Sequence, residues 1–144
     1  MNPASHASVA LTHPLPPPRK TLTDEETAHL REVLKRCSAA TFQAACQFWK
    51  TGNPYYLPTI ILGIIERFVA SDLRPPLKKP HDDLRLGEDL GLDSLTMMEI
   101  VMLTEDVLAL SIHHEELPHL RTLGDIQQFL KGKLHDQSRA MGRD

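Results

Sequence analysis

Apolar side chains along this sequence recur at spacings of three and four residues, which is the period of an amphipathic helix. The first such stretch begins at Thr23, because Thr23-Asp24-Glu25-Glu26 fits a capping box. A second helix is expected from Ala40 to Lys50, with Gly52 as its stop. The inward faces predicted for the two helices are Leu30, Val33, Leu34 and Cys37, and then Phe42, Ala45, Cys46 and Trp49.

Four further helices are predicted after this pair. The third covers Pro58 to Leu73 and ends at Arg74-Pro75-Pro76, and a long loop then reaches Gly91. The later helices are expected over Ser94–Leu110, His114–His119 and Thr122–Lys133. Three loop leucines are the expected anchors into the core, namely Leu84, Leu86 and Leu90. No segment alternates with period two, so the sequence predicts an all-α fold with a compact bundle.

The helix that begins at Ser94 carries more apolar residues than one buried face needs. Its expected core stripe is Met97, Ile100, Val101, Thr104 and Leu108. A second stripe remains, formed by Leu95, Met98 and Met102 and flanked by Asp93, Glu99, Glu105 and Asp106. An exposed Met/Leu stripe with an acidic rim suits the docking of a partner protein, since methionine adapts to varied surfaces. The alternative is that the N-terminal helices cover this second stripe.

Composition narrows the classes of function. The 144 residues carry a net charge of −3, so no excess of cations is available for binding nucleic acid. The charge is divided, with a net of +2 over residues 1–56 and −5 over residues 57–134. No Lys or Arg lies between Glu88 and Glu116. No apolar run is long enough to span a bilayer, and Cys37 and Cys46 form no disulfide framework, so we expect a cytoplasmic protein.

The motif Leu90-Gly91-Leu92-Asp93-Ser94-Leu95 carries the candidate chemistry. It places Ser94 on an exposed turn at the start of a helix, with Asp93 as the N-cap. A phosphate ester on Ser94 would meet free backbone N–H groups and the positive end of the helix dipole. Simple capping by Asp93 and Ser94 is the alternative interpretation of this motif.

Residues 57–134 resemble an acyl carrier protein of the phosphopantetheine-binding family. The resemblance rests on Asp89-Leu90-Gly91-Leu92-Asp93-Ser94-Leu95, similar to the family's D-L-G-x-D-S-L, and on Met98-Glu99-Ile100-Val101-Met102, similar to V-E-L-V-M. It implies a four-helix bundle, preceded here by a helical hairpin extension. It also implies that Ser94 carries a covalent 4′-phosphopantetheine from coenzyme A, attached by a phosphopantetheinyl transferase, and that the protein is a carrier, not an enzyme.

The resemblance extends to further residues. It implies that acyl-processing enzymes, through basic surfaces of their own, dock on one set of residues of this chain. These residues are Asp93, Leu95, Met98, Glu99, Met102, Glu105 and Asp106. It also implies shelter for an acyl chain against Ile64, Leu86, Ile112, Leu120 and Phe129. The sequence departs from the family pattern at His113-His114, at Pro118 in the short fifth helix, and at Thr104, which stands where an apolar residue is usual.

Four segments are therefore predicted. These are a disordered Pro-rich arm over 1–22, the helical extension over 23–56, the carrier domain over 57–134 and a flexible tail over 135–144. The extension is expected to pack on the bundle or to form a homodimer with a second copy. Two other functions stay open, a peptidyl or aminoacyl carrier of nonribosomal synthesis and a non-carrier interaction module. The eight histidines show no metal-ligand spacing, and neither a membrane nor a nucleic-acid partner is expected.

Overall fold

The computed structural model describes residues 21–142, with side chains through Asp136. Helices α2 (Asp24–Val33), α3 (Ala39–Thr51), α4 (Leu57–Phe68), α5 (Ser94–Leu108) and α6 (Leu123–Gly142) form the described fold. Short 3₁₀ helices η1 (Pro54–Tyr56), η2 (Ser71–Leu73), η3 (Pro75–Lys78) and η4 (His114–His119) connect them. The described range holds one isolated bridge and no strand, which confirms the all-α prediction. Residues 1–20 of the predicted Pro-rich arm lie outside the described range.

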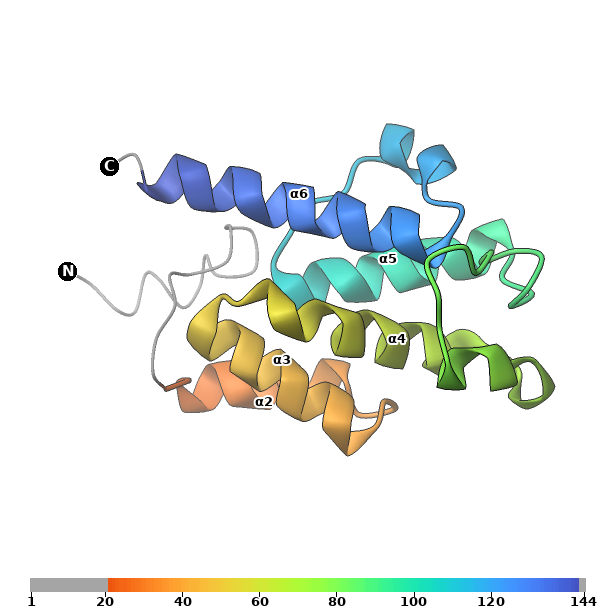
Figure 1. Ribbon diagram of the computed structural model, residues 1–144. Coiled ribbons are helices and arrows are strands. Elements are labelled where there is room, and N and C mark those ends of the chain that lie inside the picture. The colour runs from red at the N-terminus through yellow and green to blue at the C-terminus, as the bar shows by residue number, and fades with distance from the viewer. Residues whose placement is uncertain (1–20, 143–144) are drawn as a thin grey trace.

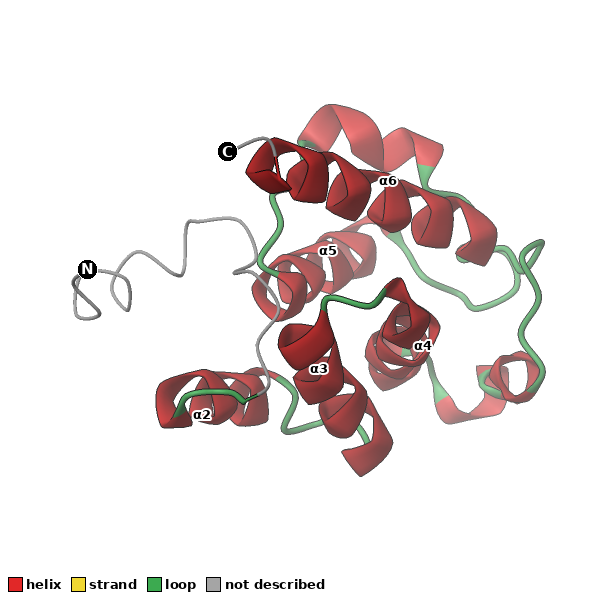
Figure 2. Cartoon of the chain, turned by 60° about the vertical axis from the view of Figure 1, so that its left-hand side comes forward, coloured by secondary structure: helices red, strands yellow, loops and turns green. Residues whose placement is uncertain are grey.

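Helix α4 lies at the centre of the fold, packed against α3, α5 and α6 (Figure 1). Its sequence explains this position, since Leu57, Ile60, Ile61, Ile64 and Ile65 are all buried. Helices α5 and α6 run along one side of α4, and the α2–α3 hairpin covers the other (Figures 1 and 2). The predicted capping box is confirmed at the start of α2, where Thr23 and Glu26 exchange two hydrogen bonds of 3.0 Å. Gly52 takes the left-handed conformation that ends α3, with φ of 69°.

The α2–α3 hairpin shares one hydrophobic core with the rest of the described chain. Its buried members are Leu30, Leu34, Ala44, Ala45, Phe48 and Trp49, which join the same cluster as the isoleucines of α4. The indole N–H of Trp49 also donates a buried 2.8 Å hydrogen bond to the carbonyl of Val107 in α5. The apolar face of the hairpin is therefore covered within one chain, as expected for packing on the bundle.

Thr41 and Gly63 mark the closest approach of α3 to α4. A Cβ atom added to Gly63 would lie 1.9 Å from Thr41 Oγ1, so only glycine fits at this position. Thr41 is itself buried, and its hydroxyl bonds Ser38 Oγ at 2.9 Å. The contact shows that the two helices meet with almost no side chain between them at this point.

Several helix ends differ from the sequence predictions, and α5 ends at Leu108 rather than Leu110. The first predicted helix ends at Val33, so Leu34 is a cap residue and Cys37 lies in the turn beyond it. The third ends at Phe68 rather than Leu73, because the backbone of Val69 becomes extended, with ψ of 132°. The carbonyl of Val69 is satisfied instead by Arg74 Nε at 2.9 Å.

The last helix does not end at Lys133. Helix α6 continues to Gly142, so residues 135–142 of the predicted flexible tail are helical. The reason lies in the sequence after Lys133, which contains no proline and no glycine before Gly142. No helix in the described range is both long enough and apolar enough to cross a membrane.

We predict that Gly63→Ala destabilises the fold by about 1–3 kcal/mol, because the new methyl group overlaps the Thr41 side chain. Chemical denaturation measures the change. Gly132→Ala in α6 is the matched control, since nothing lies within 4 Å of its added Cβ. That control should raise stability by up to about 1 kcal/mol through helix propensity. Equal effects of the two substitutions would contradict the close contact between α3 and α4.

Candidate attachment site at the start of α5

Ser94 is the first residue of α5 and is exposed. Asp93 precedes it as N-cap, and its carboxylate Oδ1 accepts a 2.8 Å hydrogen bond from the Thr96 N–H. No hydrogen bond joins the Ser94 hydroxyl to another group within residues 21–142. The site therefore presents an accessible, unengaged hydroxyl on a rigid helix end.

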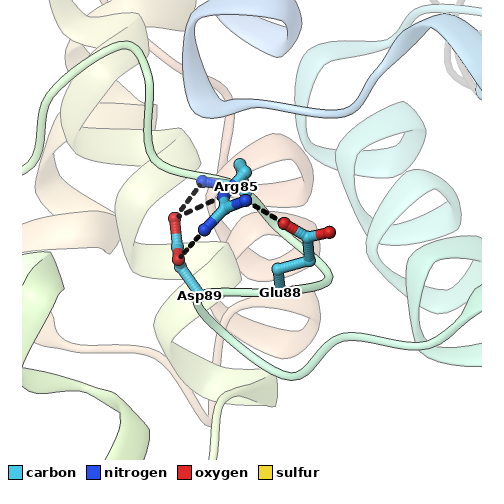
Figure 3. A network of polar contacts seen from close by, with 3 residues as sticks. All are labelled: Arg85, Glu88 and Asp89. Carbon is cyan, nitrogen blue, oxygen red and sulfur yellow. Dashed lines mark hydrogen bonds and ion pairs between the residues drawn. The ribbon is translucent and has the colours of Figure 1, made fainter.

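A tight turn over residues 85–92 leads the chain into this helix end. Asp89 Oδ2 accepts from the Arg85 N–H at 2.8 Å, and Asp89 Oδ1 pairs with Arg85 Nη2 at 3.2 Å (Figure 3). Glu88 pairs with the other side of the same guanidinium (Figure 3). Backbone bonds from Gly91 N to Gly87 O and from Leu92 N to Leu86 O close the turn. The Asp89 of the motif therefore stabilises the turn in which it lies, through its contacts with Arg85.

The segment before this turn is fixed to the start of α6. Leu86 N donates to Arg121 O at 2.9 Å, and Leu123 N donates to Leu84 O at 2.9 Å. The predicted anchors Leu84, Leu86 and Leu90 are all buried. Asp125 strengthens the same junction, because its Oδ2 accepts from the Arg121 and Thr122 N–H groups at 3.0 and 3.1 Å. These contacts position the loop although it holds almost no regular structure.

Gly91 allows the chain to turn toward Ser94. Its φ of 71° lies in the left-handed region, where a side chain would be strained. An added Cβ would also lie 2.8 Å from Leu73 Cδ1 of η2. The glycine of the motif is therefore required by backbone conformation and by the packing of η2.

Hydrogen bonds lower the pKa of both motif carboxylates. For Asp93 the main cause is the bond from the Thr96 N–H, and for Asp89 it is the bond from the Arg85 N–H. Both side chains are therefore negatively charged at neutral pH. Because Asp93 already occupies the Thr96 N–H, that one amide is not free for a phosphate ester on Ser94.

The second apolar stripe of α5 is exposed. Leu95 is 73% exposed, Met98 37% and Met102 62%, so the N-terminal helices do not cover it. Glu99 and Asp106 lie exposed on the same face, at helical spacing from these residues. The alternative in which the extension buries this stripe is wrong, because α2 and α3 contact a different part of α5.

Glu105 differs from the other residues predicted for docking. It is half-buried, and its Oε2 accepts a 2.8 Å hydrogen bond from the Ile112 N–H. The side chain thereby fastens the loop that follows α5. The structure gives Glu105 a local structural contact, whereas no ion pair involves Glu99 or Asp106 within the described residues.

The core face of α5 is wider than predicted. Ile100, Thr104 and Leu108 are buried as expected, but Leu103 and Val107 are buried as well, while Met97 and Val101 are only half-buried. The extension contributes at Val107, whose carbonyl bonds Trp49, and α2 also contacts α5. The polar Thr104 is accommodated because its hydroxyl donates to Ile100 O at 2.8 Å inside the helix.

The residues predicted to shelter an acyl chain all join the hydrophobic core. Ile64, Leu86 and Leu120 are buried, and Ile112 and Phe129 are half-buried against the same cluster. They come from α4, the loop, η4 with its flanks, and α6. These five residues therefore belong to one cluster, and their role in sheltering an acyl chain stays a prediction.

Sequence reasoning missed two contributors to the site. Arg85 organises the turn before Ser94, and its spacing of three and four residues from Glu88 and Asp89 could have indicated it. Leu73 of η2 lies against Gly91, and no local pattern in the sequence indicates that contact. Among the described residues, no group of three or more His, Cys, Asp or Glu side chains could hold a metal ion.

Comparison with known proteins places this geometry in a family. Residues 64–130 match the family model described as "Phosphopantetheine attachment site". The chain is 34% identical over 74 residues to an acyl carrier protein of Exiguobacterium sp. (strain AT1b), covering 51% of this chain and 94% of that protein. No solved structure was found to match.

Two further relatives have similar descriptions. An acyl carrier protein of Saccharopolyspora erythraea is 31% identical over 65 residues, which is 45% of this chain and 68% of that protein. A meromycolate extension acyl carrier protein of Mycolicibacterium aurum is 41% identical over 51 residues, which is 35% of this chain and 52% of that protein.

The helical fold and the matched segment define a phosphopantetheine-binding carrier domain. The chain belongs to the acyl carrier protein family. It is accordingly a carrier rather than an enzyme, and its domain carries a covalently attached 4′-phosphopantetheine. That group supplies a thiol on a flexible arm, which holds acyl groups as thioesters.

We predict that acid weakens the fold partly through Asp93. A folded-state pKa below the unfolded value means that its contribution is present above the unfolded pKa and is lost as pH falls through the folded pKa. Wild type should therefore lose stability below about pH 4, and Asp93→Asn should lose less over the same range while keeping a helix cap. Urea midpoints at neutral and acidic pH measure this difference.

Asp106→Asn is the control for this pH dependence, because Asp106 accepts no hydrogen bond from the described residues. It should follow the wild-type pH dependence. If Asp93→Asn also followed it, the charged cap would not contribute to folding.

Proposed function

We propose that this chain carries acyl intermediates as thioesters on a 4′-phosphopantetheine attached to Ser94. We further propose that it presents them to fatty-acid or polyketide-type biosynthetic enzymes. The observation that supports the attachment most directly is the exposed, hydrogen-bond-free hydroxyl of Ser94 at the start of α5. This hydroxyl lies inside the segment that matches the attachment-site family, in residues 64–130.

The surroundings of Ser94 fit a covalent phosphodiester. No hydrogen bond to a described residue has to be broken to modify the Ser94 hydroxyl. The helix N-terminus also favours a negative group nearby. The Arg85–Asp89 turn and the buried loop leucines keep the serine fixed while its side chain stays accessible. A modifying enzyme could therefore bind a preformed site at little cost in ordering.

The exposed face of α5 is the proposed docking surface for partner enzymes. It combines Leu95, Met98 and Met102 with the unpaired charges of Glu99 and Asp106. A partner surface with Lys and Arg around an apolar patch would be attracted by this charge and would bury the stripe. We propose that phosphopantetheinyl transferase and acyl-processing enzymes share this surface.

The packing of the helices supports a proposal for the division of the chain. We propose that residues 57–134 are the carrier segment and that residues 23–56 are an integral support for it. Two residues of the extension contact the carrier segment directly. Thr41 lies against Gly63 of α4, and Trp49 bonds Val107 of α5. Because the apolar side chains of the hairpin join the core of the same chain, the hairpin has less apolar surface left for a homodimer.

The pathway is proposed from the kind of relatives found. Two of them are described as acyl carrier proteins and one as a meromycolate extension acyl carrier protein. These descriptions favour fatty-acyl or related acyl cargo. The residue before the candidate serine is Asp93, as in the motif on which the acyl-carrier resemblance rests. Loading with acyl, malonyl and aminoacyl donors distinguishes this proposal from a peptidyl or aminoacyl carrier.

We predict that incubation with coenzyme A and a promiscuous phosphopantetheinyl transferase adds one phosphopantetheine to the full chain, measured by intact mass. Ser94→Ala should abolish the gain. Ser111→Ala is the matched control, since Ser111 is also exposed but lies outside any helix, and it should be modified like wild type. A gain that persists in Ser94→Ala, or no gain in wild type, would refute the proposed attachment and favour a non-carrier module.

We predict that Glu99→Lys with Asp106→Lys lowers kcat/KM of the transferase for this carrier by roughly threefold to tenfold, because two attractive charges become repulsive. Added salt should narrow the difference. Glu66→Lys is the charge control, compared with Glu99→Lys alone so that each variant changes the net charge by two, since Glu66 is exposed on α4 and is not on α5. Equal losses at the two sites would indicate a net-charge effect instead of docking on α5.

A further inference from the structure

Trp49 connects the extension to the end of the helix that begins at the candidate serine. It is the chain's single tryptophan, it is 5% exposed, and its Nε1 donates to Val107 O at 2.8 Å. Val107 lies in the last turn of α5, where carbonyl groups have no intrahelical donor. The next residue but one, Ala109, has φ of 55°, so the chain leaves the helix axis there. Trp49 therefore satisfies a buried carbonyl that α5 cannot satisfy itself.

The same turn of α5 holds the start of the following loop. Glu105 Oε2 accepts from Ile112 N at 2.8 Å, and the Glu105 carbonyl accepts from Leu110 N at 3.2 Å. Ile112 is half-buried against the core. The position of Ile112 thus depends on the last turn of α5, which Trp49 stabilises.

Helix η4 follows Ile112 and has few other attachments. None of its residues is buried. Polar contacts hold it, since Glu116 Oε1 accepts from His113 N at 2.8 Å and pairs with Lys133 Nζ of α6 at 3.3 Å. Lys133 also lies over the Phe129 ring, 5.4 Å from its centre. Its Leu117 is half-buried against the core. With this one apolar contact, the short helix takes its position largely from the segments at its two ends.

We propose that Trp49 is a positioning residue that holds η4 closed over the acyl chain. The inference rests on the proposed function, because the sheltering residues Ile112, Leu120 and Phe129 lie at the loop before η4, just after it and on α6. The contacts run from Trp49 to Val107, from Glu105 in the same turn to Ile112, and on through η4 to α6. Loss of the first contact frees the loop and lets η4 move away from the core. The N-terminal extension thereby controls how well this carrier protects its cargo.

Thioester protection tests the proposal. The full chain is loaded on Ser94 from octanoyl- or acetyl-coenzyme A with a promiscuous transferase, and cleavage by hydroxylamine is followed by intact mass. Hydroxylamine attacks the thioester carbonyl, which gives the acyl hydroxamate and the free thiol. In wild type the octanoyl thioester should be cleaved more slowly than the acetyl thioester. Trp49→Phe should reduce the ratio of the acetyl to the octanoyl cleavage rate by about threefold or more, since the ring stays buried but the N–H is lost.

Thr41→Ser is the matched control for a general loss of stability. It alters the same hairpin on its α4 side and keeps the hydroxyl that bonds Ser38. It should leave the ratio of the acetyl to the octanoyl cleavage rate unchanged. An unchanged ratio in Trp49→Phe, an equal reduction in Thr41→Ser, or no difference between the two cargoes in wild type would overturn the proposal.

Wild type alone provides a second test if Trp49→Phe fails to fold. Because Trp49 is the only tryptophan, its fluorescence reports on this contact. The emission should differ between the octanoyl and acetyl forms, and identical spectra would overturn the proposal. Failure of wild type to accept any group on Ser94 would instead refute the proposed function itself. The two failures are therefore distinguishable.

Discussion

The close contact between α3 and α4 at Gly63 is the constraint on which the rest of the arrangement depends. Helix α4 is apolar on most of its surface, and α5 and α6 cover only one side of it. The absence of a side chain at Gly63 lets Thr41 approach, so that α3 covers the other side. Without that cover, part of a strongly apolar helix would face water. The extension therefore completes the core of the carrier segment.

This cover also determines which face of α5 stays exposed. Trp49 contacts α5 at Val107 and α2 also contacts α5, whose buried face includes Leu103 and Val107. The extension does not cover the opposite stripe, and Leu95 and Met102 remain largely exposed. Burial on one side and exposure on the other are two consequences of the same packing.

Local patterns predicted most of the helices, because their causes lie within a few residues. The capping box at Thr23, the Gly52 stop and the Asp93 cap depend on neighbouring residues alone. The predicted end of α4 was wrong because the side chain of Arg74, five residues further on, donates a hydrogen bond to the carbonyl of an extended Val69. The predicted end of α6 was wrong because the small and polar residues after Lys133 suggested a frayed tail. Those residues permit a helix, which continues to Gly142.

The candidate site divides in the same way. Ser94, Asp93 and the exposed α5 stripe could be predicted, since each depends on helix position and spacing. The contact of Glu105 with Ile112 could not, because it requires the left-handed turn at Ala109, a conformation that an alanine does not suggest. The hydrogen bond from Trp49 to Val107 joins residues 58 positions apart, and no sequence pattern encodes it.

The two ends of α5 consequently have different physical roles. At the first end, the Asp93 carboxylate accepts a local hydrogen bond from the Thr96 N–H, and no described residue bonds the Ser94 hydroxyl. At the other end, the buried Val107 carbonyl is satisfied by a side chain from another part of the fold. A self-contained start permits chemistry at Ser94 without disturbing the core. An end that depends on a distant donor couples the helix to the extension, so an arm on Ser94, as proposed, and the support at the other end would act on the same helix.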